Sequence, residues 1–257
     1  MSDRAEEPGT AICGATAERI EVRGRDLVAE LVGELTFTQM FLWHLLARDP
    51  TPMQVAITDA VLVAIMEHGL VPSALAARLT LLGAPESYQG AIAAGLLGVG
   101  DRFAGTASRC AQLLDDIVGR PASERQAAAL ESVQALRREG RPVPGFGHPT
   151  HRGGDPRVPR LIEIARSRGA AGEHLAALAL LESAVAQALG RALPMNVSAA
   201  IAAVLREAGL PAQALRGIIL TARCAGLVGH LLEESQRPVA DAVWKAAERA
   251  VPYRAPE

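Results

Sequence analysis

Short helical segments separated by glycines dominate the pattern of this 257-residue chain. Thr51–Gln54 reads TPMQ, in which Thr and Gln form a capping box and proline takes the first helical position. Gly69 then ends that helix, and Asn196 and Pro211 start two later ones. Alternating runs of Val, Ile, Tyr and Phe, which strands need, are nearly absent. The sequence therefore predicts an all-α fold with more than eight helices joined by short loops.

Composition narrows the class of protein further. Apolar residues make up 49% of the chain and aromatic residues 3%, which favours a core of closely packed Ala and Leu helices. The net charge of −2 gives no basic field for nucleic acid, and no apolar run approaches the roughly 20 uninterrupted residues of a membrane span. Residues 1–19 lack a signal-peptide pattern and are expected to be flexible. The spacing of Cys13, Cys110 and Cys224 fits no disulfide framework or zinc site, so we expect a reduced, cytoplasmic protein without metal.

The segment Pro144–Arg157, PGFGHPTHRGGDPR, gathers side chains capable of chemistry. It places two imidazoles, His148 and His151, on a glycine-rich loop with unusual backbone freedom. Asp155 followed by Pro156 indicates a helix N-terminus, a position that favours bound anions. Imidazole suits proton transfer because its pKa lies near neutrality. A proton-transfer group beside arginines indicates chemistry on a small anionic substrate.

Six segments, in one order, resemble the citrate synthase superfamily. They are IEVRGRDLVAELVGELTFTQ from Ile20, MEHG from Met66, GDRFAG from Gly100, GFGHPTHRGGDPR from Gly145, PMNVS from Pro194 and TARCAGLVGHLLEESQRP from Thr221. The GDRFAG segment resembles the version in citryl-CoA lyases and in the C-terminal module of ATP-citrate lyase. Phe103 stands near where condensing enzymes place a histidine, which favours the lyase branch.

The resemblance implies an enzyme that makes or breaks the carbon–carbon bond between acetyl-CoA and the keto carbon of oxaloacetate. His148 matches the histidine that hydrogen-bonds the substrate hydroxyl or carbonyl, and His68 matches a second contact to a hydroxyl or carboxylate. Arg157 and Arg223 resemble carboxylate-binding arginines, whose guanidinium groups can form bidentate pairs. Arg237 resembles an arginine that reaches the site of the partner in a homodimer.

The resemblance also implies contacts to the thioester and to coenzyme A. Asp101 and Phe103 would shape the thioester pocket, where backbone N–H groups would stabilise an enolate oxygen. Arg152, Gly145 and Gly147 are the expected contacts to coenzyme A, and the alternative for Arg152 is a simply exposed side chain.

Ser198 departs from the family pattern, which has an aspartate there to move the proton on and off the acetyl methyl carbon. A serine hydroxyl is a far weaker acid, and losing a positioned acid or base costs about 10²–10⁴-fold in rate. No Asp or Glu lies between Leu193 and Leu205, so a shifted alignment does not restore the acid. Three explanations stay open: relocated or altered chemistry, with His151 as the candidate for the relocated proton transfer, weak standard activity, or a non-catalytic role.

The family fold implies a large helical domain, residues 20–105 and 194–257, and a smaller helical domain, residues 106–193, with the site between them. We expect cleavage of citryl-CoA, or of a related 3-hydroxy-3-carboxyacyl-CoA, to acetyl-CoA and oxaloacetate or another 2-oxo acid. The alternatives are condensation in the reverse sense, or a non-catalytic homologue that binds CoA or citrate. The expected partners are these small molecules and further copies of the chain in a homodimer or larger homo-oligomer, with no nucleic acid and no membrane.

Some other residues are expected to have structural roles. Three further histidines are read as structural or surface residues: His44, His174 and His230. Glu233 and Glu234 read as a solvated helix end, and Trp43 and Trp244 as packing anchors.

Overall fold

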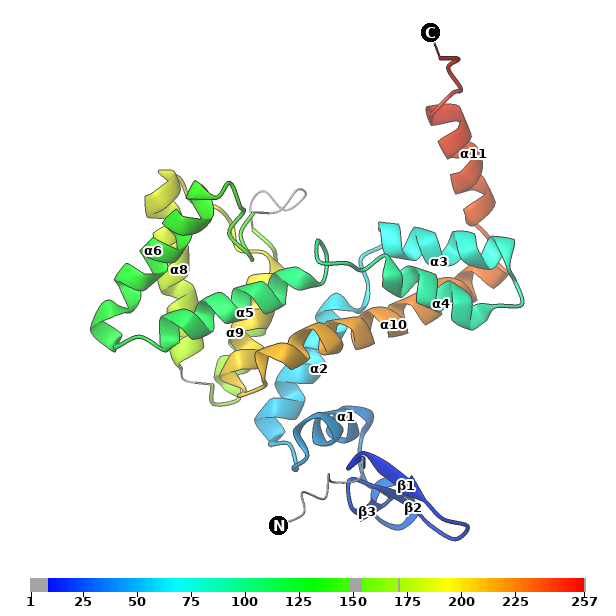
Figure 1. The fold of residues 1–257 in the computed structure, drawn as a ribbon, viewed down its shortest axis with the longest axis horizontal. Helices are drawn as coiled ribbons and strands as arrows, with labels where there is room; N and C mark the ends of the chain where they lie inside the picture. The colour runs from blue at the N-terminus through cyan, green and yellow to red at the C-terminus, as the bar shows by residue number, and fades with distance from the viewer. Residues whose placement is uncertain (1–8, 148–153, 171, 257) are drawn as a thin grey trace, which may run out of the picture. The chain divides into compact units, whose positions relative to one another are not determined.

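The computed structural model describes residues 9–147, 154–170 and 172–256, which form two compact units. The first unit ends at Ala56 and the second begins at Ile57. The first contains a three-stranded antiparallel sheet, a π-helical turn and a helix (Figure 1): β1 (Cys13–Ala15), β2 (Ile20–Val22), β3 (Arg25–Asp26), η1 (Leu27–Leu31) and α1 (Phe37–Leu46).

A tight hairpin and a small core organise the first unit. Arg23 and Gly24 have φ of 48° and 80° and connect β2 to β3 as the two central residues of the turn. Trp43, only 4% exposed, packs with Val22 and Leu31, so its prediction as a packing anchor is confirmed. Strand β1 lies inside the segment that was expected to be flexible.

The second unit consists of helices joined by loops (Figure 1). In chain order they are α2 (Pro52–Met66), whose first residues belong to the first unit, α3 (Pro72–Gly83), α4 (Tyr88–Leu97), α5 (Gly105–Val118), η2 (Ala122–Glu124), α6 (Arg125–Arg138), α7 (Arg157–Ser167), α8 (Glu173–Leu189), α9 (Val197–Glu207), α10 (Ala212–Gln236) and α11 (Ala240–Ala250). The predicted capping box starts α2: Gln54 N donates to Thr51 Oγ1 (3.2 Å) and Thr51 N donates to Gln54 Oε1 (3.0 Å). The all-α prediction is thus confirmed, with a small sheet added.

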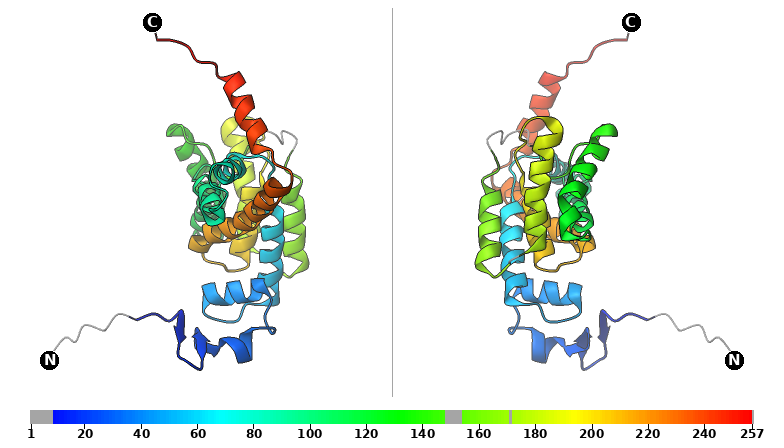
Figure 2. Two further views of the ribbon diagram at one scale, coloured as in Figure 1. Left: turned by 90° about the vertical axis from the view of Figure 1, so that its right-hand side faces the viewer. Right: turned by 90° about the vertical axis from the view of Figure 1, so that its left-hand side faces the viewer.

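Helix α10 connects two groups of helices in this unit. It contacts α3 and α4 in one group and α5 and α9 in the other, and Figures 1 and 2 show it running along both. Residues 199–205 of α9 are all buried, and this helix also contacts α7 and α8. Because most of these buried residues are alanines, the neighbouring helices can approach α9 closely.

Among the described helices, α10 alone is long and apolar enough, by length and composition, to cross a membrane. Its side chains Leu215, Ile218, Leu227 and Leu231 are buried, however, and Glu234 near its end is buried in an ion pair. In the structure 39% of the apolar window is buried, and a single helix of this length and composition is weak evidence for a membrane span.

Three segments differ from the sequence expectations. Residues 20–40 were read as a short start, a turn and one amphipathic helix, but they contain β2, β3 and η1 before α1 begins. α8 ends at Leu189 instead of Leu193, because Gly190 takes a left-handed conformation with φ of 66°. α11 was not predicted, and Trp244 on it is 54% exposed, so its prediction as a packing anchor is wrong. The division into a large and a small domain stays a prediction.

The glycine-rich loop before α7 is attached to the segment before α9. Gly147 N donates to Pro194 O (2.8 Å), and Asn196 N donates to Gly145 O (2.9 Å). Asn196 Nδ2 also donates to Gly147 O (2.8 Å). Phe146 and Met195 consequently pair as an isolated antiparallel bridge. Two motifs about 50 residues apart in the chain therefore form one structural element.

Asp155 connects this region to the starts of α7 and α9. Its buried Oδ1 accepts from Arg157 N (3.1 Å) and Nε (2.9 Å), and Oδ2 accepts from Arg157 Nη2 (2.8 Å) and Val197 N (3.0 Å). Burial raises the pKa of this carboxyl, but the hydrogen bonds and charge of Arg157 and the bond from Val197 outweigh it and lower the pKa to about 2. The helix begins at Arg157 and not at Pro156 as expected, while Asp155 still accepts from its first N–H.

Gly145→Ala should destabilise the protein more than Gly147→Ala. Gly145 has φ of 89°, and a Cβ there would lie 2.7 Å from the Ala199 Cβ, so the variant adds a clash to backbone strain. Gly147 has φ of 80° with nothing within 4 Å of an added Cβ, so its variant costs only the strain, about 1–2 kcal/mol. We expect Gly145→Ala to cost about 1–3 kcal/mol more in urea unfolding. Equal losses would show that the contact with α9 relaxes freely.

Asp155→Asn should lower the free energy of unfolding by about 2–3 kcal/mol at pH 7, because it removes charge-assisted bonds to Arg157. The folded-state pKa is depressed to about 2, so the carboxylate's contribution is complete above the unfolded value of about 4 and is lost as pH falls toward 2. Urea unfolding at a series of pH values should show a constant difference between wild type and variant down to about pH 4.5 and a shrinking one below it. A difference unchanged at about pH 3 would contradict this linkage.

Candidate active site

Two arginines converge on the last turn of α2. Arg157 Nη1 donates to Ala64 O (3.3 Å), and Arg223 Nη1 donates to Ile65 O (3.1 Å) and Met66 O (3.4 Å). The carbonyls at the end of a helix lack partners within it and carry the negative end of its dipole, so they attract cations. The structure thus brings together the two arginines that the sequence predicted to bind carboxylates.

The environment of these arginines favours an anion. Burial lowers the pKa of Arg223, Glu67 opposes this shift, and the nearby positive charge of Arg157 lowers the pKa further. A negative charge placed beside both guanidinium groups would relieve their mutual repulsion. Asp155 already holds the Nε–Nη2 edge of Arg157, so a ligand would meet that arginine through its other N–H groups.

His68 lies in the turn that follows α2 and is exposed. It therefore shares the carboxyl end of α2 with Arg157 and Arg223. Three predicted residues lie outside the described part of the chain: His148, His151 and Arg152. The described residues that flank them, Gly147 and Gly154, belong to the loop held by Asn196 and Asp155.

Ser198 is in the first turn of α9, and its side chain position is half-buried. Its N–H donates to Asn196 Oδ1 (3.0 Å), so the prediction that Asn196 caps this helix is confirmed. The preceding N–H, of Val197, is bound by the Asp155 carboxylate. The helix start at Ser198 is therefore fixed to the segment that also holds Arg157.

The remaining predicted site residues have other surroundings. Asp101 forms ion pairs with Arg216 (2.6 Å) and Arg109 (3.8 Å), and Phe103 is 51% exposed in the same turn before α5. Arg237 is exposed at the end of α10. Within the described ranges, none of the contacts of Asp101, Phe103 or Arg237 joins them to the two arginines at α2.

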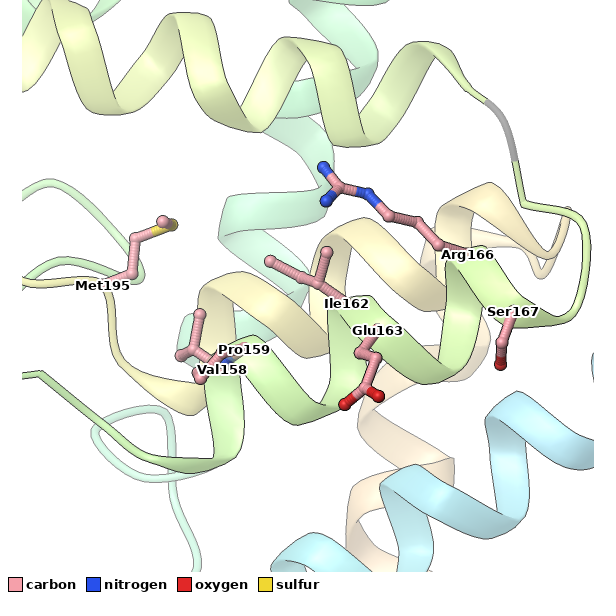
Figure 3. Close-up of a pocket in the computed structure, with 7 residues that line it drawn as sticks. All are labelled: Val158, Pro159, Ile162, Glu163, Arg166, Ser167 and Met195. Carbon is pink, nitrogen blue, oxygen red and sulfur yellow. The ribbon is translucent and has the colours of Figure 1, made fainter.

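An open groove of about 680 Å³ runs along α7 beside the glycine-rich loop. Its walls come from one helix and one loop residue: Val158, Pro159, Ile162, Glu163, Arg166, Ser167 and Met195. Figure 3 shows Arg166 extending from α7 toward α8, with Met195 near the first turn of α7. Because Met195 pairs with Phe146, the groove adjoins the loop predicted to contact coenzyme A.

A buried ion-pair cluster beside this site was missed by sequence reasoning. Arg78 on α3 is 2% exposed; its Nη1 donates to Glu234 Oε2 (2.7 Å) and its Nη2 to Glu233. Glu234 is 6% exposed, so its prediction as a solvated residue is wrong. Burial raises the pKa of Glu234, but hydrogen bonds from Ala240 and Arg78 outweigh this and lower it. One feature of the sequence indicated a buried charge here: Arg78 stands inside the apolar run ALAARLTLL.

Within the described residues, no group of three His, Cys, Asp or Glu side chains is placed to hold a metal ion. The three cysteines are free, and burial raises the pKa of the Cys110 thiol to about 12.

Comparison with known proteins gives one consistent family. "Putative citrate synthase 2" of Mycobacterium tuberculosis is 28% identical over 194 residues, which is 73% of this chain and 50% of that protein. The chain thus spans half the length of the curated relatives it matches. Citryl-CoA lyase from Hydrogenobacter thermophilus matches in structure with a TM-score of 0.84 and 29% identity, over 97% of this chain and 95% of that one.

A second solved structure shares the fold. ATP citrate lyase of Methanosaeta concilii, in complex with (3S)-citryl-CoA, matches with a TM-score of 0.77 and 20% identity, over 98% of this chain and 43% of that one. Residues 10–244 match the family described as citrate synthase, C-terminal domain. This chain therefore belongs to the citrate synthase family.

Proposed function

We propose that this protein is a carbon–carbon lyase that cleaves citryl-CoA, or a related 3-hydroxy-3-carboxyacyl-CoA, to acetyl-CoA and oxaloacetate or another 2-oxo acid. The observation that carries the proposal is the pair of arginines beside His68 at the end of α2, which suits a substrate with several carboxylates. The structural likeness to a citryl-CoA lyase, over 95% of that chain, supports cleavage over condensation as the direction of the reaction.

The reaction requires a base, an acid and cations. A base removes the proton of the tertiary hydroxyl, the neighbouring carbon–carbon bond breaks to give the 2-oxo acid, and the acetyl-CoA enolate takes a proton on carbon. We assign the hydroxyl contact to His148 with His68, and the substrate carboxylates to Arg157 and Arg223. Asp155 holds Arg157 in place and cannot itself serve as the acid, because a group with a pKa of about 2 is ionised at neutral pH.

Because Ser198 stands where the family has an aspartate, the protonation of the acetyl-CoA enolate lacks its usual acid. We propose that His151, three residues after His148, takes this role. The first three N–H groups of α9 are already bound by Asp155 and Asn196, so the start of this helix offers a developing enolate oxygen its dipole and not these donors.

We also propose that coenzyme A lies along the glycine-rich loop. Gly145 and Gly147 let the backbone approach a ligand closely, and Arg152 would meet a phosphate. The adjoining groove on α7 offers apolar side chains for the pantetheine arm and Arg166 for a second anionic group. Asp101 and Phe103 would then border the thioester from the turn before α5.

A cytoplasmic homodimer, or a larger homo-oligomer, is part of the proposal. Arg237 is exposed at the end of α10, and we assign it a contact to the site of a second copy. Large apolar side chains are exposed on the same part of the chain, among them Leu232, Trp244 and Val251. The free cysteines support a reducing compartment.

Two other functions have an observation in their favour. Condensation of acetyl-CoA with oxaloacetate uses the same contacts, and the curated relatives carry a citrate synthase name. A non-catalytic protein that binds CoA or citrate is favoured by Ser198 alone. Incubation with citryl-CoA, with oxaloacetate measured by coupled reduction with NADH, separates the lyase from the binding protein: cleavage supports the lyase, and tight binding without turnover supports the binding protein. Release of free CoA from acetyl-CoA and oxaloacetate measures condensation.

Arg223→Gln should lower kcat/KM for citryl-CoA about 10–10²-fold, because it removes a charge-assisted contact to a substrate carboxylate. Arg160→Gln is the matched control, since Arg160 is an exposed arginine on α7 whose ion pair among the described residues is with its neighbour Glu163. The coupled assay and thermal unfolding should be run on both variants. Equal kinetic losses in the two variants would remove Arg223 from the site.

Ser198→Asp should raise citryl-CoA cleavage about 10-fold or more, because it restores a carboxyl group where the family places one. The variant should also unfold at a slightly higher temperature, since an acidic residue in the first turn of α9 favours the helix dipole. The control is Ser198→Asn, which has the same shape without a titratable proton. A gain in stability without a gain in rate would show that the site is built for different chemistry.

A further inference from the structure

The buried guanidinium of Arg78 links α3 to α10 and to the start of α11. Its Nε and Nη2 contact His230 Nδ1 at 3.0 Å and 2.8 Å, and its Nη1 donates to Glu234 Oε2 at 2.7 Å. Glu234 Oε1 accepts from Val239 N (2.9 Å) and Ala240 N (2.8 Å). These contacts with His230 and Glu234 of α10 hold the Arg78 guanidinium in one position.

This arginine determines which ring nitrogen of His230 carries the proton. A guanidinium has only donors, so the Nδ1 atom facing Arg78 must offer its lone pair. In the neutral ring the proton is then on Nε2, which lies 3.0 Å from Glu67 Oε1. A proton on Nδ1 would instead point an N–H at the Arg78 guanidinium, so the contact selects the Nε2–H tautomer.

Glu67 extends the chain of contacts to the turn that carries His68. Its Oε1 lies 3.0 Å from His230 Nε2 as an ion-pair contact, and its Oε2 accepts from Gly69 N at 3.2 Å. The residues on both sides of His68 are thus joined by one carboxylate, and that carboxylate is held from α10.

The face of α10 that meets this turn leaves little free space. Arg223, Gly226 and His230 follow one another at helical spacing, and Arg223 binds the carbonyl of Met66. A Cβ on Gly226 would lie 2.1 Å from the same carbonyl oxygen. The remaining cavity is about 10 Å³, which excludes a substrate from it.

We propose that Arg78, His230 and Glu67 form a positioning relay that sets the orientation of His68, with His230 as the neutral Nε2–H tautomer. None of the three touches the substrate; they act through the turn. The charged groups around His230 are Arg78 on α3, Glu67 in the turn, and Glu233, Glu234 and Arg223 on α10. The relay rests on the proposed lyase function, because that function makes His68 a substrate contact.

The test compares two substitutions of His230 that each keep half of the relay. His230→Asn places an acceptor near the position of Nδ1 for Arg78 but does not reach Glu67. It should release the turn, with faster amide hydrogen exchange at Gly69 and a fall of about 10–10²-fold in kcat/KM for citryl-CoA, mostly in kcat. His230→Gln reaches Glu67 but does not match the Nδ1 position, so Gly69 should keep more of its protection. His174→Asn is the control, since His174 pairs with Asp115 and should not affect Gly69.

Gly69 exchange at the wild-type rate in His230→Asn would overturn the relay whether or not citryl-CoA is the substrate. Faster exchange with unchanged kcat and KM would overturn its role in the reaction. Ring ¹⁵N shifts of His230 give a further readout that needs no substrate, and a proton found on Nδ1 at pH 7 would also overturn the proposal. A wild-type protein that lacks lyase activity but shows the Nε2–H tautomer and the Gly69 effect would refute the proposed function and retain the relay as the device that orients the turn.

Discussion

The carboxylate of Asp155 is the contact on which the arrangement of the site depends. It accepts four hydrogen bonds, three from Arg157 and one from Val197, and so joins the starts of α7 and α9 in one place. A buried carboxylate is costly unless its oxygens are paired, and here all four bonds come from the two segments that the site requires. The same pairing keeps the group ionised and directs the rest of the Arg157 guanidinium toward α2.

The carboxyl end of α2 provides the complementary feature. Three of its carbonyls accept from Arg157 and Arg223, so a helix terminus assembles two cations from α7 and α10. The last carbonyls of a helix usually accept hydrogen bonds from water or a capping group. Those of α2 accept from two arginines that we also assign to the substrate. The unsatisfied carbonyls of one helix thereby hold the two arginines that we propose bind the substrate carboxylates.

Local signals predicted much of this structure, and long-range contacts account for most of what they missed. The capping box at Thr51 and the cap at Asn196 are encoded within a few residues, and the structure has both. The convergence of Arg157 and Arg223 was expected only through the family resemblance, since no spacing rule connects them. The partners of Arg78 lie more than 150 residues away in sequence, so nothing near Glu234 revealed that its side chain is buried.

Gly226 puts the backbone of α10 directly against the carbonyl of Met66. Side chains absorb small displacements by changing rotamer, but a backbone-to-backbone contact has no such compliance. A substitution that pushes α10 away at Gly226 must therefore displace the backbone at Met66, next to the turn that carries His68. The same helix packs against α5 and α9 at its other end, so one long helix borders both regions.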